Sequence, residues 1–272
     1  MAKITAADVN KLRKQTGAGM MDCKNALVEA DGDFEAAIDV LRKKGQKVAA
    51  KRADRDAVEG AVIAKTNGSS KGVIIKLSCE TDFVAKNENF VALANELASK
   101  ALECGAKTPE EFGATTYDGA ITVAEKLLEQ TGVIGEKIEV AEMATIEAPY
   151  VASYIHMGNK IATLVGLSSE AAEAGRDVAM QAAAMNPVAL NREAVSQDLI
   201  DRELEVGRDL ARQEGKPEEM LDKIAQGRLG KFFKENTLVD QAFIKDNKLS
   251  VAQYLTSVEK GLTVTAFERI SL

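Results

Sequence analysis

The chain has 272 residues, of which 42 are acidic and 35 are basic, so its formal net charge is −7. This acidic balance argues against a general nucleic-acid binder, because such proteins use cations to neutralise phosphates. A single histidine and three widely separated cysteines also exclude the common zinc sites, and no metal or cofactor is expected. The N-terminus lacks the apolar core of a signal peptide and no segment approaches the ~18 apolar residues of a membrane span, so we expect a cytoplasmic protein with no membrane contact.

Residues 1–46 are predicted to form a compact module of three short helices. Val9 and Leu12 share one face of the first helix, which ends in a glycine-containing turn. The second helix covers MMDCKNALVEA, and the third covers FEAAIDVLRKKG, where Gly45 is expected to stop the helix. The charged segment 47–59 is weakly periodic and predicts either a linker or a solvated helix.

A change from helical to β periodicity marks a first α+β subdomain at residues 60–148. Two β-branched runs, AVIAKT and VIIKLSC, flank a glycine-rich turn and predict a hairpin. The next helix is predicted from Asn87, a suitable N-cap, to Cys104. A helix that ends near Gly132 and a strand at 137–147 complete this subdomain.

Residues 149–190 repeat this order of elements. YVASYIH and IATLVGLS flank a turn at 157–160 and predict a second hairpin, and residues 171–185 predict the helix that follows it. The segments KLSCETDFVAKNENFVALANELA and VGLSSEAAEAGRDVAMQAAAM form a weak internal repeat. We therefore predict an α+β fold whose core consists of two related subdomains.

Residues 191–236 are predicted to form an inserted helical hairpin. Its two helices meet at the sequence Gly-Lys-Pro, where glycine ends one helix and proline begins the next. The high charge and the narrow apolar stripe indicate that this hairpin projects into solvent. Residues 237–272 are expected to return to the second subdomain and to end in a strand.

The segment TDFVAKN places a large apolar ring in a polar turn between a strand and a helix. In one interpretation Phe83 plugs the core beneath the loop, while Asp82 caps the turn. In the other, Phe83 is an exposed wedge beside an acid, ready to enter a pocket on a partner protein. Burial of such a ring contributes about 1.5–3 kcal/mol, which is enough for a binding hot spot.

Other candidate contact residues lie at two further turns. Met20 and Met21 either fill gaps in the small helical core or form an adaptable contact surface. Arg13 is expected to be a solvated cation, and His156 a surface or contact residue rather than a general base. The segment TGAGMM lacks the GKS/T ending of a phosphate loop and follows a helix, so the chain is not expected to bind a nucleotide itself.

Several of these segments resemble the elongation factor Ts family. TGAGMMDCKNALVEADGDFEAAIDVLRKKG is similar to the N-terminal module of that family, and CETDFVAKNENF is similar to its central signature. SYIHMGNKIATLV resembles the hairpin of its second core subdomain, and VSQDLIDRELEV with EGKPEEMLDKIAQGRLGKFFKE resembles its helical insertion. The similarity extends from Ile4 to about Glu235, and the first two motifs are highly specific together.

The resemblance implies both a fold and a function. The fold would combine a three-helix module like a ubiquitin-associated domain, two related α+β subdomains and a coiled-coil hairpin. The function would be guanine nucleotide exchange: the chain would bind the GDP-bound form of elongation factor Tu, displace Mg²⁺ and promote GDP release so that GTP can bind. No covalent chemistry is involved, and a homodimer or a heterotetramer with elongation factor Tu is compatible with the family.

The same resemblance assigns individual residues to contacts with elongation factor Tu. Those that would reach its nucleotide-binding domain near the magnesium site are Thr81, Asp82, Phe83 and Val84. Those that match positions gripping the same domain from the N-terminal module are Arg13, Met20 and Met21. His156 matches a position that faces the third domain of elongation factor Tu.

Two other functions are compatible with the residues alone. A non-catalytic binding or scaffold protein would use the N-terminal module to recognise a different partner, and Phe83 would then be a core plug whose loss unfolds the chain. A small enzyme would use Cys79, Asp82 and His156. In that case, alkylation of the nucleophilic thiol would be rapid and would abolish activity.

Overall fold

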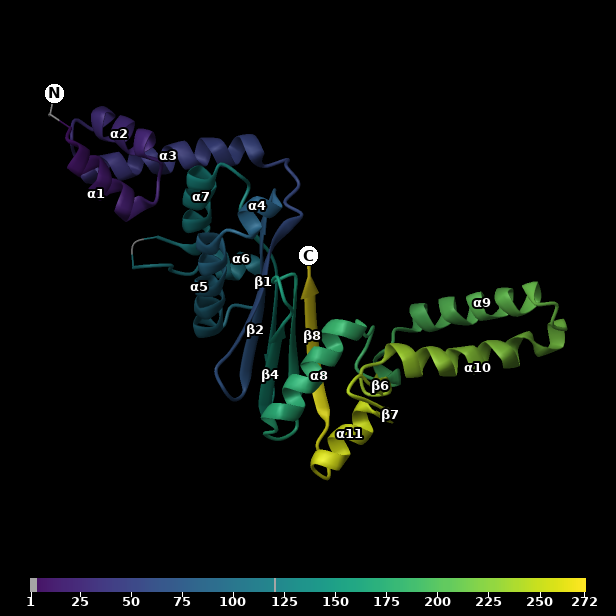
Figure 1. The fold of residues 1–272 in the computed structure, drawn as a ribbon. Coiled ribbons are helices and arrows are strands. Elements are labelled where there is room, and N and C mark those ends of the chain that lie inside the picture. The colour runs from purple at the N-terminus through teal and green to yellow at the C-terminus, as the bar shows by residue number, and fades with distance from the viewer. Residues whose placement is uncertain (1–3, 120) are drawn as a thin grey trace.

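The structure, a computed structural model, describes residues 4–119 and 121–272, so residues 1–3 of the predicted N-terminal module lie outside the described part. The fold is mixed α+β (Figure 1). Within the described residues, two three-stranded antiparallel sheets form its centre. The first has the order β1-β2-β3, with strands Glu59–Thr66, Lys71–Cys79 and Glu139–Glu147. The second has the order β4-β5-β8, with strands Tyr150–Ile155, Ile161–Leu167 and Val264–Ser271.

The two sheets pack face to face, and a helix covers each outer face. Along β1, Val62 and Ala64 join a buried cluster shared by both sheets, whereas Ala61 and Ile63 join the cluster under helix α5 (Glu88–Cys104). Both faces of β1 are therefore buried, which explains its unbroken apolar run. Helix α8 (Ala172–Met185) covers the other sheet in the same way.

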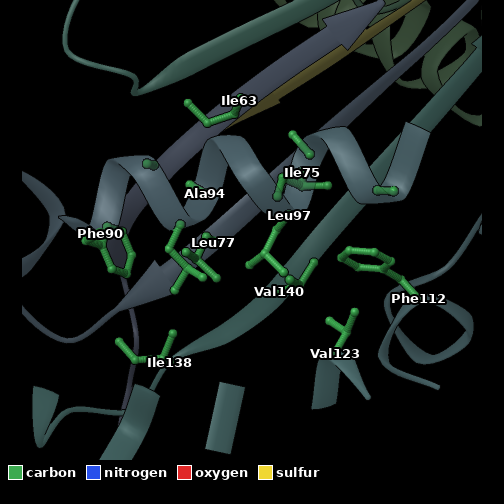
Figure 2. Packing of buried hydrophobic residues seen from close by; sticks show 14 of the residues in the cluster. Ile63, Ile75, Leu77, Phe90, Ala94, Leu97, Phe112, Val123, Ile138 and Val140 are labelled. Carbon is green, nitrogen blue, oxygen red and sulfur yellow. The ribbon is translucent and has the colours of Figure 1, made fainter. Parts of the chain in front are cut away.

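The core beneath α5 consists of its apolar stripe packed on the sheet (Figure 2). Phe90, Ala94 and Leu97 of the helix face Leu77 and its neighbours on the strands. Helices α6 (Pro109–Gly113) and α7 (Val123–Ile134) close this core at one side; short helix α4 (Asp82–Ala85) precedes α5. The predicted helix N-cap at Asn87 is confirmed, because its side chain accepts a hydrogen bond from the Asn89 N–H at 2.9 Å.

The N-terminal module contains α1 (Ala6–Thr16), α2 (Met20–Glu29) and α3 (Phe34–Arg52) around a small core of its own. The prediction that Gly45 stops the third helix is wrong, since α3 continues to Arg52. Gly45 instead lies where α3 crosses α7, and a Cβ at that position would come within 2.9 Å of the Leu128 carbonyl oxygen. The glycine therefore permits close helix packing. Residues 47–52 extend α3, which agrees with the helical alternative for the segment 47–59.

The remaining helices and strands follow the second hairpin. A 3₁₀ turn, η1 (Arg192–Ala194), leads into α9 (Gln197–Gln213) and α10 (Glu218–Asn236), which pack against each other and extend away from the body (Figure 1). The chain returns through β6 (Ala242–Phe243), β7 (Asp246–Ser250) and α11 (Val251–Val258) to β8. The predicted hairpins, the helical hairpin and the final strand are confirmed; β3 begins two residues later than predicted.

No helix in the described part of the chain is both long and apolar enough to cross a lipid bilayer.

Candidate partner-binding surface

The turn that follows β2 exposes Phe83. Thr81 caps the single-turn helix α4, and the Ala85 N–H donates to the Thr81 carbonyl oxygen at 3.1 Å. Ala85 and Phe90 are buried, Val84 is half-buried against the same core, and the Phe83 side chain is 85% exposed. The interpretation of Phe83 as a core plug is therefore wrong.

Two carboxylates hold this turn in place. Glu136, from the loop after α7, accepts hydrogen bonds from the N–H groups of Glu80 and Thr81 at 3.1 and 3.0 Å, and from the Thr81 hydroxyl at 2.7 Å. Glu80 accepts from the Lys137 N–H at 2.7 Å and from Arg52 at 2.7 and 2.8 Å. The Lys137 N–H and the Arg52 guanidinium lower the pKa of the Glu80 carboxyl.

These anchoring residues were not among the candidates from the sequence. Glu136 and Thr81 are separated by 55 positions, so no local pattern joins them. The only local signal is the Gly-Glu dipeptide after a helical pattern, because a glycine there often ends a helix in a left-handed conformation.

Asp82 lies beside the exposed ring and is itself held by a local ion pair. Lys86 Nζ lies 2.6 Å from Asp82 Oδ2, one helical turn along the chain, and this hydrogen bond lowers the pKa of Asp82. Both side chains reach solvent, with the Lys86 side chain 72% and the Asp82 side chain 44% exposed. Such a pair contributes little to stability, so Asp82 is free to exchange its partner.

The N-terminal module carries exposed candidate residues, and its Gly17 turn lines the same cleft as Phe83. Met20 and Met21 are 54% and 64% exposed, so they do not fill the small helical core, and Arg13 is exposed as expected. A cleft of about 540 Å³ separates the turn at Gly17, which ends α1, from Phe83. The N-terminal module and the Phe83 turn therefore border one cleft.

His156 occupies the exposed turn between β4 and β5. Its Nδ1 lies 3.1 Å from the Tyr154 hydroxyl, and the next residue, Met157, is 89% exposed. The turn is attached to β1 by the Val62 N–H, which donates to the Asn159 carbonyl oxygen at 2.8 Å. Helix α4 also packs on β1, so both turns contact the same strand.

The geometry does not support catalysis by Cys79, Asp82 and His156. Cys79 is fully buried, and burial, with the nearby Glu136 carboxylate, raises the pKa of its thiol to about 12. Such a thiol is a poor nucleophile near neutral pH. Among the described residues, no hydrogen bond links Cys79 with Asp82 or His156, and no cluster of potential metal ligands is present.

The chain is similar to known proteins over its whole length. The family model described as elongation factor TS matches residues 80–272. Proteins named elongation factor Ts from Christiangramia forsetii and Flavobacterium psychrophilum are 65% and 59% identical, over 100% of both chains in each case. The protein of the same name from Porphyromonas gingivalis is 48% identical over 99% of this chain and 98% of its own. The chain therefore belongs to the elongation factor Ts family and is a guanine nucleotide exchange factor for elongation factor Tu, not an enzyme.

Proposed function

We propose that Phe83 is the wedge through which this exchange factor opens the nucleotide site of elongation factor Tu. Thr81, Asp82 and Val84 complete the turn that enters the partner near its bound Mg²⁺. The observation that carries the proposal is the 85% exposure of an aromatic side chain on a turn whose backbone is firmly anchored. Aromatic residues, phenylalanine included, are enriched at protein–protein interfaces relative to the rest of the protein surface.

The energetic logic requires no covalent chemistry. An exchange factor binds the nucleotide-free partner more tightly than the nucleotide-bound partner, and linkage makes GDP binding weaker by the same factor. Burial of the Phe83 ring contributes about 1.5–3 kcal/mol. This favourable binding free energy offsets the loss of the contacts that elongation factor Tu makes with GDP and Mg²⁺. Insertion of the wedge therefore favours nucleotide release.

Asp82 and Val84 have different roles in the proposed contact. Asp82 carries a negative charge next to the ring, and its exposed pair with Lys86 is easily broken when a partner offers better contacts. We assign Asp82 to the approach toward the magnesium site. Val84 is half-buried against the core beneath α5, so it supports the turn from behind as well as completing its surface.

The N-terminal module and the second hairpin supply the remaining contacts in this proposal. Met20 and Met21 are exposed, and flexible thioether side chains adapt well to a protein surface. Together with Arg13 they grip the nucleotide-binding domain beside the Phe83 turn. His156, on the exposed turn of the other subdomain, faces the third domain of elongation factor Tu.

We propose a matching division of the chain. Residues 1–46 form a module like a ubiquitin-associated domain, and residues 60–148 and 149–190 form the two related subdomains. The segment 47–59, which links the module to the first subdomain, includes the end of α3. Residues 191–236 form a coiled-coil insertion, and 237–272 return to the second subdomain. The chain just before the insertion meets its last residue: the Val188 N–H donates to the Asn236 carbonyl oxygen at 2.9 Å.

Release of a fluorescent GDP analogue from elongation factor Tu tests the role of Phe83. We expect the wild-type chain to accelerate release strongly and folded Phe83→Ala to lose most of that acceleration. Val258→Ala is a matched control, because Val258 is also exposed but lies on α11 of the other subdomain. Equal acceleration by wild type and Phe83→Ala would refute the wedge.

A further inference from the structure

We propose that Glu136 is a positioning residue for nucleotide exchange: its carboxylate fixes the backbone of the turn that presents Phe83. The inference rests on the function proposed for Phe83. It adds a residue that does not itself contact the partner. Glu136 is half-buried and lies in the loop between α7 and β3.

The backbone of the Phe83 turn has to be held in place by residues outside the turn. Helix α4 has four residues, and a single helical turn is not stable by itself. The Phe83 side chain is 85% exposed and gives little support to its own backbone. The Glu136 carboxylate supplies the anchor, because it accepts from two consecutive backbone N–H groups and from the Thr81 hydroxyl, all within 3.1 Å.

The loop that carries Glu136 is itself held. Gly135 ends α7 with a φ of 81°, a left-handed conformation that favours glycine, and this reverses the chain direction before Glu136. Two residues further on, the Ile138 N–H donates to the buried Thr131 hydroxyl at 3.3 Å. Glu136 therefore projects from a loop that is tied back to the last turns of α7.

The two segments hold each other reciprocally. Glu136 accepts from the backbone at residues 80 and 81, while the Glu80 carboxylate accepts from the Lys137 N–H at 2.7 Å. Arg52, at the end of α3, adds two contacts to the same Glu80 carboxylate. The turn is thus fixed at one point to the loop after α7 and to the end of α3.

The test compares Glu136→Ala and Glu136→Gln with wild type in the fluorescent GDP release assay, over a range of chain concentrations. We expect Glu136→Ala to lower the maximal release rate about tenfold, the change that corresponds to about 1.4 kcal/mol of lost transition-state stabilisation. Glu136→Gln should keep most of the rate, because an amide oxygen still accepts backbone N–H donors. Glu125→Ala is the matched control: Glu125 accepts from the Thr122 N–H at 2.7 Å at the other end of α7, away from the turn.

A double variant separates positioning from general loss of structure. If Glu136 acts through Phe83, adding Glu136→Ala to Phe83→Ala should slow release little further, whereas independent effects multiply. An unchanged maximal rate in Glu136→Ala, beside a slow Phe83→Ala, would overturn the inference and leave the wedge intact. Full multiplication of the two effects would overturn it as well. Normal release by Phe83→Ala would instead refute the wedge, and with it the role of Glu136.

Discussion

Gly45 of α3 and Gly132 of α7 face each other where the two helices cross, and a Cβ on Gly132 would lie only 2.6 Å from the Gly45 Cα. The two backbones are therefore in direct contact. This crossing joins the N-terminal module to the first subdomain, and α7 leads directly into the loop that carries Glu136. The position of the module and that of the Phe83 turn thus depend on the same helix.

We expect Gly132→Ala to destabilise the chain by about 1–3 kcal/mol, because the added methyl group forces the helices apart. Urea unfolding followed by circular dichroism measures this change. Gly227→Ala is the control: Gly227 also lies inside a helix, but nothing lies within 4 Å of its added Cβ. That variant should gain about 0.5–1 kcal/mol from helix propensity. Equal stabilisation by both substitutions would contradict a tight crossing.

Phe83 and Phe90 provide a second matched pair, seven residues apart in one segment. Phe83→Ala should change the free energy of unfolding by no more than about 0.5 kcal/mol, because its side chain is 85% exposed. Phe90→Ala should cost about 3–5 kcal/mol, because Phe90 is 3% exposed in the core beneath α5. Thermal unfolding of both variants checks the contrast. A large loss of stability in Phe83→Ala would instead show that the Phe83 side chain packs in the core.

Local signals predicted most of the elements correctly. Glycine-rich turns between β-branched runs define the hairpins, and the N-cap at Asn87 defines the start of α5, because these features depend on neighbouring residues alone. The same reasoning misjudged Gly45. A glycine after a helical pattern is compatible with a helix end and with a close helix crossing, and only the position of α7 distinguishes them.

The site was predicted only in part, because some of its features depend on contacts between residues far apart in the sequence. The TDFV turn was identified, but exposure of Phe83 depends on which side of the turn meets the core, and both orientations fitted the sequence. Glu136 was missed because its partners, Glu80 and Thr81, lie 56 and 55 positions away. The face-to-face packing of the sheets was also not predicted, although the unbroken apolar run of β1 is typical of a strand buried on both faces.

The thiols should differ widely in reactivity. Cys104 is exposed, whereas Cys23 and Cys79 are buried, and burial raises the pKa of both buried thiols. Iodoacetamide near neutral pH should therefore modify Cys104 first, as measured by mass spectrometry of peptides. Exchange activity should persist, because Cys104 ends α5 about 24 Å along the helix from Glu88. Loss of activity in step with modification of Cys79 would revive the enzyme hypothesis.

Alkaline pH should weaken the hydrogen bond through which Tyr254 of α11 contacts α8. The Tyr254 hydroxyl donates to the buried Asp177 carboxylate at 3.1 Å, and burial, together with that carboxylate, raises the pKa of Tyr254 to about 12. In the unfolded chain a tyrosine ionises near pH 10, so the contribution of Tyr254 is complete below about pH 10 and is lost as pH rises toward 12.

Comparison of wild type with Tyr254→Phe isolates this contribution. At pH 9 we expect the wild type to be more stable by about 1.5–3 kcal/mol, the contribution of one hydrogen bond to a charged group. As pH rises from 10 to 12 the difference should shrink, because the unfolded wild-type chain releases the tyrosine proton while the phenylalanine variant has none to release. Urea midpoints across this range measure the difference, and a gap that stays constant would show that Tyr254 titrates alike in both states.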